Sequence, residues 1–238
     1  MSQATLKMKR VLFSFNDENG GPRGLQAKFY PYGNMLTRLM AEVYDGPKYK
    51  FLNIDFNTQA VYDRYGEENH EHPLKSRGGY FHYNAIIDLD TFLQKPDEEQ
   101  IRYVWDEAYR IFSTAAQRLN NPALGEAAQH AYEEGLRIDL DPDYRMIERD
   151  ITLDGISLKA AIWARYRGEK TAGVLTIERG DDMLLEYTLV TVDTALEVFY
   201  VIFRAIEQDG RTLIVKGMRD ANLPKKILLP DGLDRIRR

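Results

Sequence analysis

Cysteine is absent from the 238-residue chain. Disulfide bonds, thiolate zinc sites, iron–sulfur sites and a cysteine nucleophile are therefore excluded. The chain also lacks an apolar run of roughly 18 residues, the length that a membrane-spanning helix needs. Its first fifteen residues have no apolar core of the kind found in secretion signals. From these absences we expect a cytoplasmic protein with no membrane partner.

A large excess of basic residues is absent as well. The chain has 37 Asp and Glu against 32 Lys and Arg, a formal net charge of −5. Because nucleic-acid binding needs clustered Lys and Arg side chains, we expect no nucleic-acid partner. Internal repeats and Pro/Ser-rich linkers are missing too. The hydrophobic content of 44% is enough for a substantial core.

The charges that are present are unevenly distributed. Residues 60–100 contain nine acids against four bases, and residues 133–154 contain eight against three. Residues 216–238 contain seven bases against three acids. Runs of this kind are most often solvated loops and helix ends. The functional alternative is an acidic face that binds a basic protein partner.

The first part of the chain is expected to combine strands with helices. A turn signal at Asn19-Gly20, between the apolar stretches 10–15 and 25–32, predicts a β-hairpin. The helical spacing of apolar residues predicts a helix over 34–44. Further strands are expected over 48–56 and 80–89, joined by a charged loop over 57–78.

Two helices follow, and they have the clearest local patterns. Asp97 and Gln100 give the first a start that resembles a capping box. Asn121, Pro122 and Gly135 mark the start and the end of the second. The first helix has one apolar stripe at helical spacing: Ile101, Val104, Trp105, Ala108, Ile111, Phe112, Ala115 and Leu119.

From about Tyr144 onward the apolar residues alternate with a period of two. Four such strands with short turns predict an antiparallel meander, because parallel pairing needs a long crossover. The segment 194–208 is apolar almost all round and starts with a capping box from Thr194 to Glu197. It predicts a helix buried across one face of the sheet. A closing strand is expected over 212–218.

These patterns together predict an α+β protein. A mixed strand and helix lobe that contains the helical pair is expected over residues 1–140. An antiparallel sheet lobe with one buried helix is expected over residues 141–238. Because no linker separates them, the two lobes are expected to be closely associated or to form one domain.

Three histidines raise the question of a metal site. His70 and His72 lie one residue apart, and His82 follows on an expected strand. Three imidazoles with an open position could hold a catalytic zinc ion, which would make the chain a metal-dependent hydrolase. The plainer interpretation is a charged surface loop, because the pair precedes Pro73 in a polar stretch. We therefore expect no metal and no cofactor.

Other catalytic patterns are missing. The chain has no G-x-S-x-G elbow, and His130 lies midway along a helix with no recognisable partner. The glycine-rich stretch 20–24 matches neither the dinucleotide nor the Walker pattern. Residues 139–144 alternate aspartates but lack the glycine and glutamate of a calcium loop. The sequence therefore favours a binding protein over an enzyme.

The chain contains fifteen tyrosines, eight of them before residue 85. Tyrosines among charged residues are typical of protein-recognition surfaces, although they are also ordinary strand residues. The candidate residues for partner binding are the acidic Glu67, Glu68, Glu71, Asp139, Asp141 and Asp143 and the aromatic Tyr62, Tyr65 and Tyr80.

The segments "FLNIDF", "DEEQIRYVWDEAYRIFSTAAQ", "DPDYRMIERDITLDG" and "TLIVKGMRD", in that order, resemble bacterial immunity proteins that neutralise polymorphic toxins. The resemblance spans about residues 50–219 and includes no catalytic motif. It implies a non-enzymatic protein that binds a cognate toxin, the C-terminal domain of an effector, and occludes its active site. The alternatives are a metal-dependent hydrolase that uses His70, His72 and His82, and a small-ligand-binding regulatory domain with its pocket against the uncovered face of the antiparallel sheet.

Overall fold

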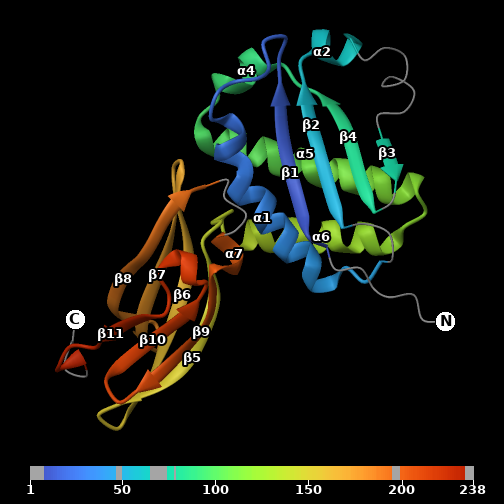
Figure 1. The fold of residues 1–238 in the computed structure, drawn as a ribbon. Helices are drawn as coiled ribbons and strands as arrows, with labels where there is room; N and C mark the ends of the chain where they lie inside the picture. The colour runs from blue at the N-terminus through green and yellow to red at the C-terminus, as the bar shows by residue number, and fades with distance from the viewer. Residues whose placement is uncertain (1–7, 47–49, 65–73, 78, 195–198, 234–238) are drawn as a thin grey trace. The chain divides into compact units, whose positions relative to one another are not determined.

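A computed structural model describes residues 8–46, 50–64, 74–77, 79–194 and 199–233. The chain divides into two compact units, Met1–Pro142 and Asp143–Arg238 (Figure 1). Helices with a largely parallel sheet in unit 1 and antiparallel sheets in unit 2 confirm the α+β class. Within these ranges no helix combines the length and the apolar character that a membrane span requires.

Unit 1 is built on a four-stranded sheet with the order β1-β2-β4-β3. Strands β1 (Arg10–Asn16), β2 (Phe51–Asn57) and β4 (Tyr80–Ile86) run parallel, and β3 (Leu74–Arg77) pairs antiparallel with β4. Parallel neighbours need a long crossover, and helix α1 (Leu25–Val43) supplies it between β1 and β2. The carboxyl ends of three strands therefore meet at one edge of the sheet.

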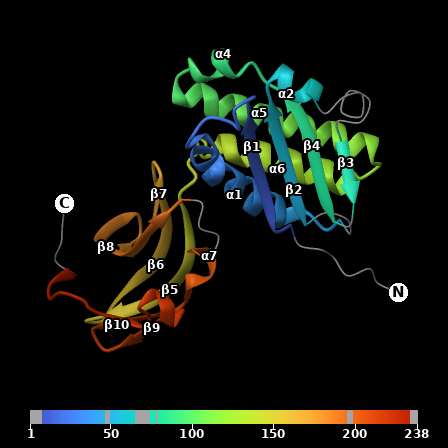
Figure 2. The same ribbon diagram turned by 45° about the horizontal axis from the view of Figure 1, so that its top comes forward.

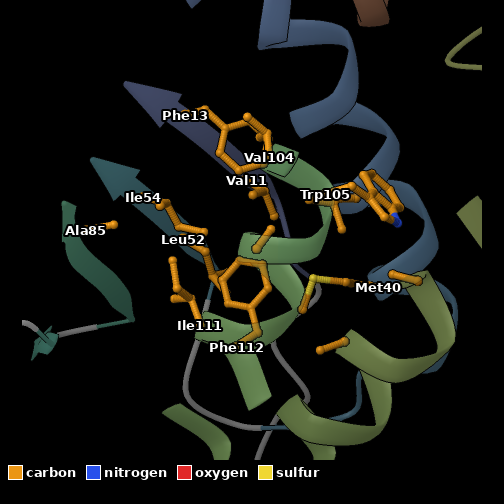
Figure 3. Packing of buried hydrophobic residues seen from close by; sticks show 14 of the residues in the cluster. Val11, Phe13, Met40, Leu52, Ile54, Ala85, Val104, Trp105, Ile111 and Phe112 are labelled. Carbon is orange, nitrogen blue, oxygen red and sulfur yellow. The ribbon is translucent and has the colours of Figure 1, made fainter. Parts of the chain in front are cut away.

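The long helices leave one face of this sheet uncovered. Helices α5 (Asp97–Arg118) and α6 (Pro122–Arg137) lie across the opposite face, and α1 runs beside β1 and packs on α6 (Figures 1 and 2). Alternate residues of β1 and β2 enter the core, where Phe13 and Leu52 pack towards Phe112 and Trp105 of α5 (Figure 3). Two shorter helices of unit 1 are α2 (Gln59–Arg64) and α4 (Leu89–Leu93).

The expected helical pair is confirmed by α5 and α6. The Asn121 side chain accepts a hydrogen bond from the Leu124 N–H and so caps α6. A Cβ atom on Gly135 would lie 2.2 Å from the Trp105 ring, so the small residue lets the two helices approach closely. The indole N–H of Trp105 donates to the Tyr132 carbonyl at 3.3 Å, which satisfies its buried polar atom.

The expected hairpin over 10–32 is wrong. Residues from Leu25 onward are helical, and β1 pairs with β2 in parallel. Leu25 and Phe29, one helical turn apart, are both buried, so the stretch that resembled a strand is the amphipathic start of α1. The loop expected over 57–78 contains α2 and β3.

Unit 2 contains the expected antiparallel meander. Its strands are β5 (Tyr144–Leu153), β6 (Ile156–Arg167), β7 (Lys170–Arg179) and β8 (Asp182–Asp193), in chain order. A second sheet has the order β11 (Lys225–Leu228), β10 (Thr212–Gly217) and β9 (Phe203–Asp209). Between β10 and β11 lies the 3-10 helix Arg219–Ala221. Residues of both sheets form one apolar core, which includes Ile162, Leu175 and Leu213.

The helix expected over 194–208 is wrong in extent and role. Only α7 (Phe199–Ile202) is helical among its described residues, and Phe203 onward forms β9, paired with β10. Aromatic and β-branched residues favour strands, and a segment buried on both sides can be either element. Phe203 packs over Gly173, where a Cβ atom would lie 2.6 Å from the ring. A second sheet therefore faces the meander.

Candidate functional site

Polar side chains end all three parallel strands on the face of the sheet that α5 and α6 leave uncovered. The register aligns Ser14 with Asp55 and Asp55 with Asn84, so these residues lie side by side. In open parallel sheets, ligands bind outside the carboxyl ends of the strands. The polar residues at this edge are Ser14 and Asn16 on β1, Asp55 and Asn57 on β2, and His82 and Asn84 on β4.

A cavity of about 600 Å³ lies over these strand ends. Its volume falls within the range of roughly 300–1,000 Å³ that is usual for small-molecule sites. We call it the strand-end cavity. It is lined by Ser14, Asn16, Asp17, Glu18, Gly20, Asp55, Asn57, Val61, Arg64, His82 and Asn84.

Asp55 and His82 form a hydrogen-bonded pair in this cavity. The Asp55 Oδ2 and His82 Nε2 atoms are 2.5 Å apart, on neighbouring strands. The Asp55 side chain is 21% exposed and the His82 side chain 42%, so both are partly accessible. A carboxylate on one ring nitrogen orients a histidine and fixes which nitrogen carries the proton. The pair therefore presents an ordered imidazole to the cavity.

Asn57 organises the neighbouring amides. It is 1% exposed, and its Nδ2 group donates to the Asp55 carbonyl at 3.2 Å and to Asn84 Oδ1 at 3.3 Å. Its Oδ1 atom accepts from Asn16 Nδ2 at 3.0 Å. A buried amide that is bonded on both sides is held in one orientation. Asn57 thereby positions Asn16 and Asn84 at the cavity wall.

The loop between β1 and α1 closes another side of the cavity. Asp17 Oδ1 accepts hydrogen bonds from the backbone N–H of Asn19 at 2.7 Å and of Gly21 at 2.9 Å. The Gly21 bond, followed by the Asn19 bond, lowers the pKa of Asp17 from its ordinary value. A Cβ atom on Gly21 would lie 2.0 Å from the Phe15 carbonyl oxygen, so only glycine fits. The Asp17 side chain therefore fixes the conformation of the loop, and the loop places Glu18 at the cavity.

The strand-end cavity does not form a nucleophilic triad. Ser14 is on β1 and His82 is on β4, with β2 between them. Two strand spacings amount to roughly 10 Å, which is beyond hydrogen-bond reach. Among the described residues the Ser14 hydroxyl has no hydrogen-bond partner, so it can bond a ligand. The arrangement suits the binding of a polar molecule.

The predicted aromatic anchors differ in their positions. Tyr62 is 5% exposed, and burial raises its pKa, so this residue belongs to the core and is not a surface anchor. Tyr80 is 53% exposed and stacks on Phe51, with ring centroids 4.9 Å apart. The Arg10 guanidinium lies over the same Phe51 ring at 5.5 Å. Tyr65 lies outside the described residues.

The predicted acidic contacts that the structure describes have different surroundings. Glu67, Glu68 and Glu71 lie outside the described residues. Asp143, in unit 2, accepts hydrogen bonds from the Tyr166 N–H at 2.7 Å and from Arg167 at 3.0 Å, so its carboxylate supports the sheet. Asp139 and Asp141 are exposed in the connector that follows α6. Among the predicted contact residues that the structure describes, Tyr80 lies on the same sheet face as the strand-end cavity.

The metal interpretation stays a prediction. His70 and His72 lie outside the described residues, and the described His82 is hydrogen-bonded to Asp55. Within the part of the chain that the structure describes, no three His, Asp or Glu side chains are grouped as metal ligands. Metal analysis of the protein purified without chelators tests the hydrolase hypothesis, which requires a stoichiometric transition metal.

Sequence reasoning missed most of this site. Asp55, Asn57 and Asn84 form hydrogen bonds between neighbouring strands that are distant in sequence, so no local motif predicts them. A usable signal was present in "FLNIDFN" and "YFHYNAI", where polar residues alternate with buried apolar ones up to the strand ends. Two such strands in parallel would place those polar residues together. The small-ligand hypothesis placed the pocket on the C-terminal antiparallel sheet, whereas the strand-end cavity lies on the largely parallel sheet of unit 1.

No protein-family model, curated protein or solved structure matches the chain.

Proposed function

We propose that unit 1 binds a small polar molecule in the strand-end cavity. The observation that carries this proposal is the hydrogen-bonded Asp55–His82 pair, placed beside the Asn57 network at the carboxyl ends of three parallel strands. Hydrogen-bond donors and acceptors that are held in place in this way fix the orientation of a bound ligand and make the site specific. Since Ser14 is too far from His82 to serve as its nucleophile, the proposal is binding without covalent catalysis.

The lining supports a polar ligand in preference to an apolar one. Apart from Val61 and Gly20, every lining residue has a polar or charged side chain. An apolar molecule placed there would remove these groups from water without giving them partners, which costs free energy. A ligand with several hydroxyl, amino or carboxyl groups replaces the lost water contacts.

A ligand screen by thermal shift on the full chain tests this proposal. A polar metabolite that binds the folded state raises the melting temperature in proportion to the logarithm of its concentration. The variant His82→Ala should abolish the increase, because it removes one half of the pair.

The chain offers a matched control. His130 Nε2 lies 2.8 Å from Glu42 Oε2, a second histidine–carboxylate pair outside the cavity lining. The variant His130→Ala should keep the full ligand response. An equal loss of response in both variants would contradict the assignment of the ligand to the strand-end cavity.

A second candidate function is the protein binding implied by the resemblance to immunity proteins. One observation favours it. Tyr80 is 53% exposed, on the uncovered sheet face, and stacked on Phe51, as expected of a rigid aromatic anchor. A pull-down from native cells with wild type and Tyr80→Ala tests it. If wild type retains a near-stoichiometric toxin and Tyr80→Ala loses it, the result supports the immunity hypothesis. Equal retention by both proteins would mean that Tyr80 is not part of the binding surface.

The pull-down also has a matched control. Tyr187 of β8, in unit 2, is 40% exposed and therefore offers a similarly accessible ring outside the proposed surface. Tyr187→Ala should leave retention of the partner unchanged. If both tyrosine variants lost the partner, a general loss of stability would explain the result and the surface would not be assigned.

A further inference from the structure

The strand-end cavity contains five groups that can carry charge, and three of them already have hydrogen-bond partners within the chain. Asp17 accepts two backbone N–H groups of its own loop. Asp55 and His82 are bonded to each other. The other two charged groups, Glu18 and Arg64, are therefore the ones that can form ion pairs with a ligand.

Glu18 and Arg64 have no partner among the described residues. Neither side chain forms a hydrogen bond or an ion pair there, and they do not pair with each other. Both are exposed and both line the same cavity, Glu18 from the loop after β1 and Arg64 from the end of α2. Some other exposed arginines of unit 1 do pair, such as Arg102 with Asp106 at 2.8 Å, whereas exposed Arg118, away from the cavity, has no partner among the described residues.

We infer that the ligand of the strand-end cavity is a zwitterion of the amino-acid type, with its ammonium group on Glu18 and its carboxylate on Arg64. This inference rests on the proposed function and names its ligand class. One negative and one positive side chain on one cavity complement a molecule that carries both charges. A guanidinium group binds a carboxylate through two parallel hydrogen bonds, which adds geometric specificity.

Asp17 argues against a phosphorylated ligand. The glycine-rich loop after β1 leads into the start of α1, and such turns commonly bind phosphate through their N–H groups. Here the Asn19 and Gly21 N–H groups already bind the Asp17 carboxylate. An anion in that turn would compete with an attached carboxylate and would be repelled by it. The loop is therefore arranged to exclude phosphate.

The uncharged groups suit the rest of an amino acid. The Ser14 hydroxyl has no partner in the described part of the chain, and Asn16 and Asn84 are held in place by Asn57. Hydroxyl and amide groups both donate and accept hydrogen bonds. They therefore fit a polar side chain in preference to a long apolar one.

Titration of the ¹⁵N-labelled full chain with L-amino acids, followed by backbone amide shifts, tests the inference. Each amino acid that binds is compared with the amine that lacks its carboxylate and the acid that lacks its amine. Glucose and inorganic phosphate complete the panel. We expect an amino acid to shift amides at residues 14–24 and 57–64, and each single-charge analogue to bind at least tenfold more weakly.

Two charge variants extend the test. Glu18→Gln and Arg64→Gln should each weaken binding of the amino acid about tenfold or more, because each removes one ionic contact. Glu133→Gln and Arg118→Gln, on exposed parts of α6 and α5, remove the same charges away from the cavity and should leave affinity unchanged.

The outcomes separate this inference from the proposed function. Binding of glucose, phosphate or a single-charge analogue at the same amides, with the two cavity variants unaffected, would overturn the zwitterion and keep the cavity as a ligand site. If no compound of the panel moved the cavity amides, the proposed function itself would fail, and the inference with it.

Discussion

At the scale of single residues, the strand-end cavity depends on Asn57. This side chain is fully buried, yet it is polar and bonded to groups on both neighbouring strands. Buried polar groups persist in folded proteins when their partners are supplied, and they then fix the positions of those partners. These hydrogen bonds explain why an amide side chain occupies a buried position in β2.

We predict that Asn57→Ala lowers the free energy of unfolding by about 1–3 kcal/mol, because Asn16 and Asn84 each lose a hydrogen bond to the buried amide. Chemical denaturation measures the change. Asn53→Ala, on the same face of β2, is the control. The Asn53 Oδ1 atom is buried without a hydrogen-bond partner, so truncation there should cost less. A larger loss in Asn53→Ala than in Asn57→Ala would contradict the role assigned to Asn57.

The pKa of Asp17 leads to a prediction about pH. Its folded value lies below the ordinary 3.8 because of the Gly21 and Asn19 N–H groups. The ionised side chain therefore adds stability above the unfolded pKa, and this contribution is lost as the pH falls through the folded pKa. We expect Asp17→Asn to melt at a lower temperature than wild type near pH 7, with the difference vanishing in strong acid.

Melting curves from neutral to acidic pH test this expectation. Asp45→Asn, an exposed aspartate after α1, serves as the control for removal of one negative charge. A difference between wild type and Asp17→Asn that grew towards acidic pH would contradict the assigned hydrogen bonds.

At the scale of elements, the approach of α1 to the sheet depends on a glycine. A Cβ atom on Gly33 would lie 2.5 Å from the Val11 carbonyl oxygen of β1. The Thr37 Oγ1 atom accepts from the Val11 N–H at 2.7 Å and satisfies an edge-strand donor. Helix α1 therefore covers the outer edge of the sheet, where an open backbone could pair with another chain.

We predict that Gly33→Ala destabilises unit 1 by about 1–3 kcal/mol, because the helix must move away from β1. Gly125→Ala is the matched helical control. The new methyl group there would meet Ala116 Cβ at 3.3 Å, and alanine also favours the helix. Denaturant midpoints measure both changes. Equal midpoints for the two variants would contradict the close packing of α1 on β1.

Elements whose apolar residues follow one clear period could be predicted from the sequence. Elements without such a period could not. The stripe of α5 and the alternation of β6 each specify one structure. The segment 194–208 is apolar on all sides, so local pattern cannot separate a buried helix from the strand β9. The site was missed for another reason. Asp55 and His82 are far apart in sequence, and parallel pairing alone brings them together.

At the scale of the whole molecule, two units have separate cores. Unit 2 has its own buried polar network, in which the Glu178 side chain binds Arg145 at 2.6 Å, Thr176 at 2.6 Å and the Trp163 indole at 3.2 Å. The Arg145 guanidinium also lies 4.9 Å from the Trp163 ring centroid. This network stabilises the meander independently of the strand-end cavity.

We predict that Glu178→Ala lowers the stability of unit 2 by about 2 kcal/mol, since it removes a carboxylate that accepts from Arg145 and Trp163 and leaves them with Glu148 and Thr176. Because every residue that lines the strand-end cavity belongs to unit 1, ligand affinity should not change. Denaturation and ligand titration of the same variant measure the two quantities. A parallel loss of affinity would mean that unit 2 contributes to the site.

Amide shifts in the ¹⁵N-labelled full chain, mapped as a ligand from the thermal-shift screen is added, show directly whether the ligand binds in the strand-end cavity. We expect shifts at the ends of β1, β2 and β4 and in the loop that contains Asp17 and Glu18, and we expect none of these shifts in the variant His82→Ala. Shifts confined to unit 2 or to the helical face of unit 1, or a response that is unchanged in His82→Ala, would contradict this expectation.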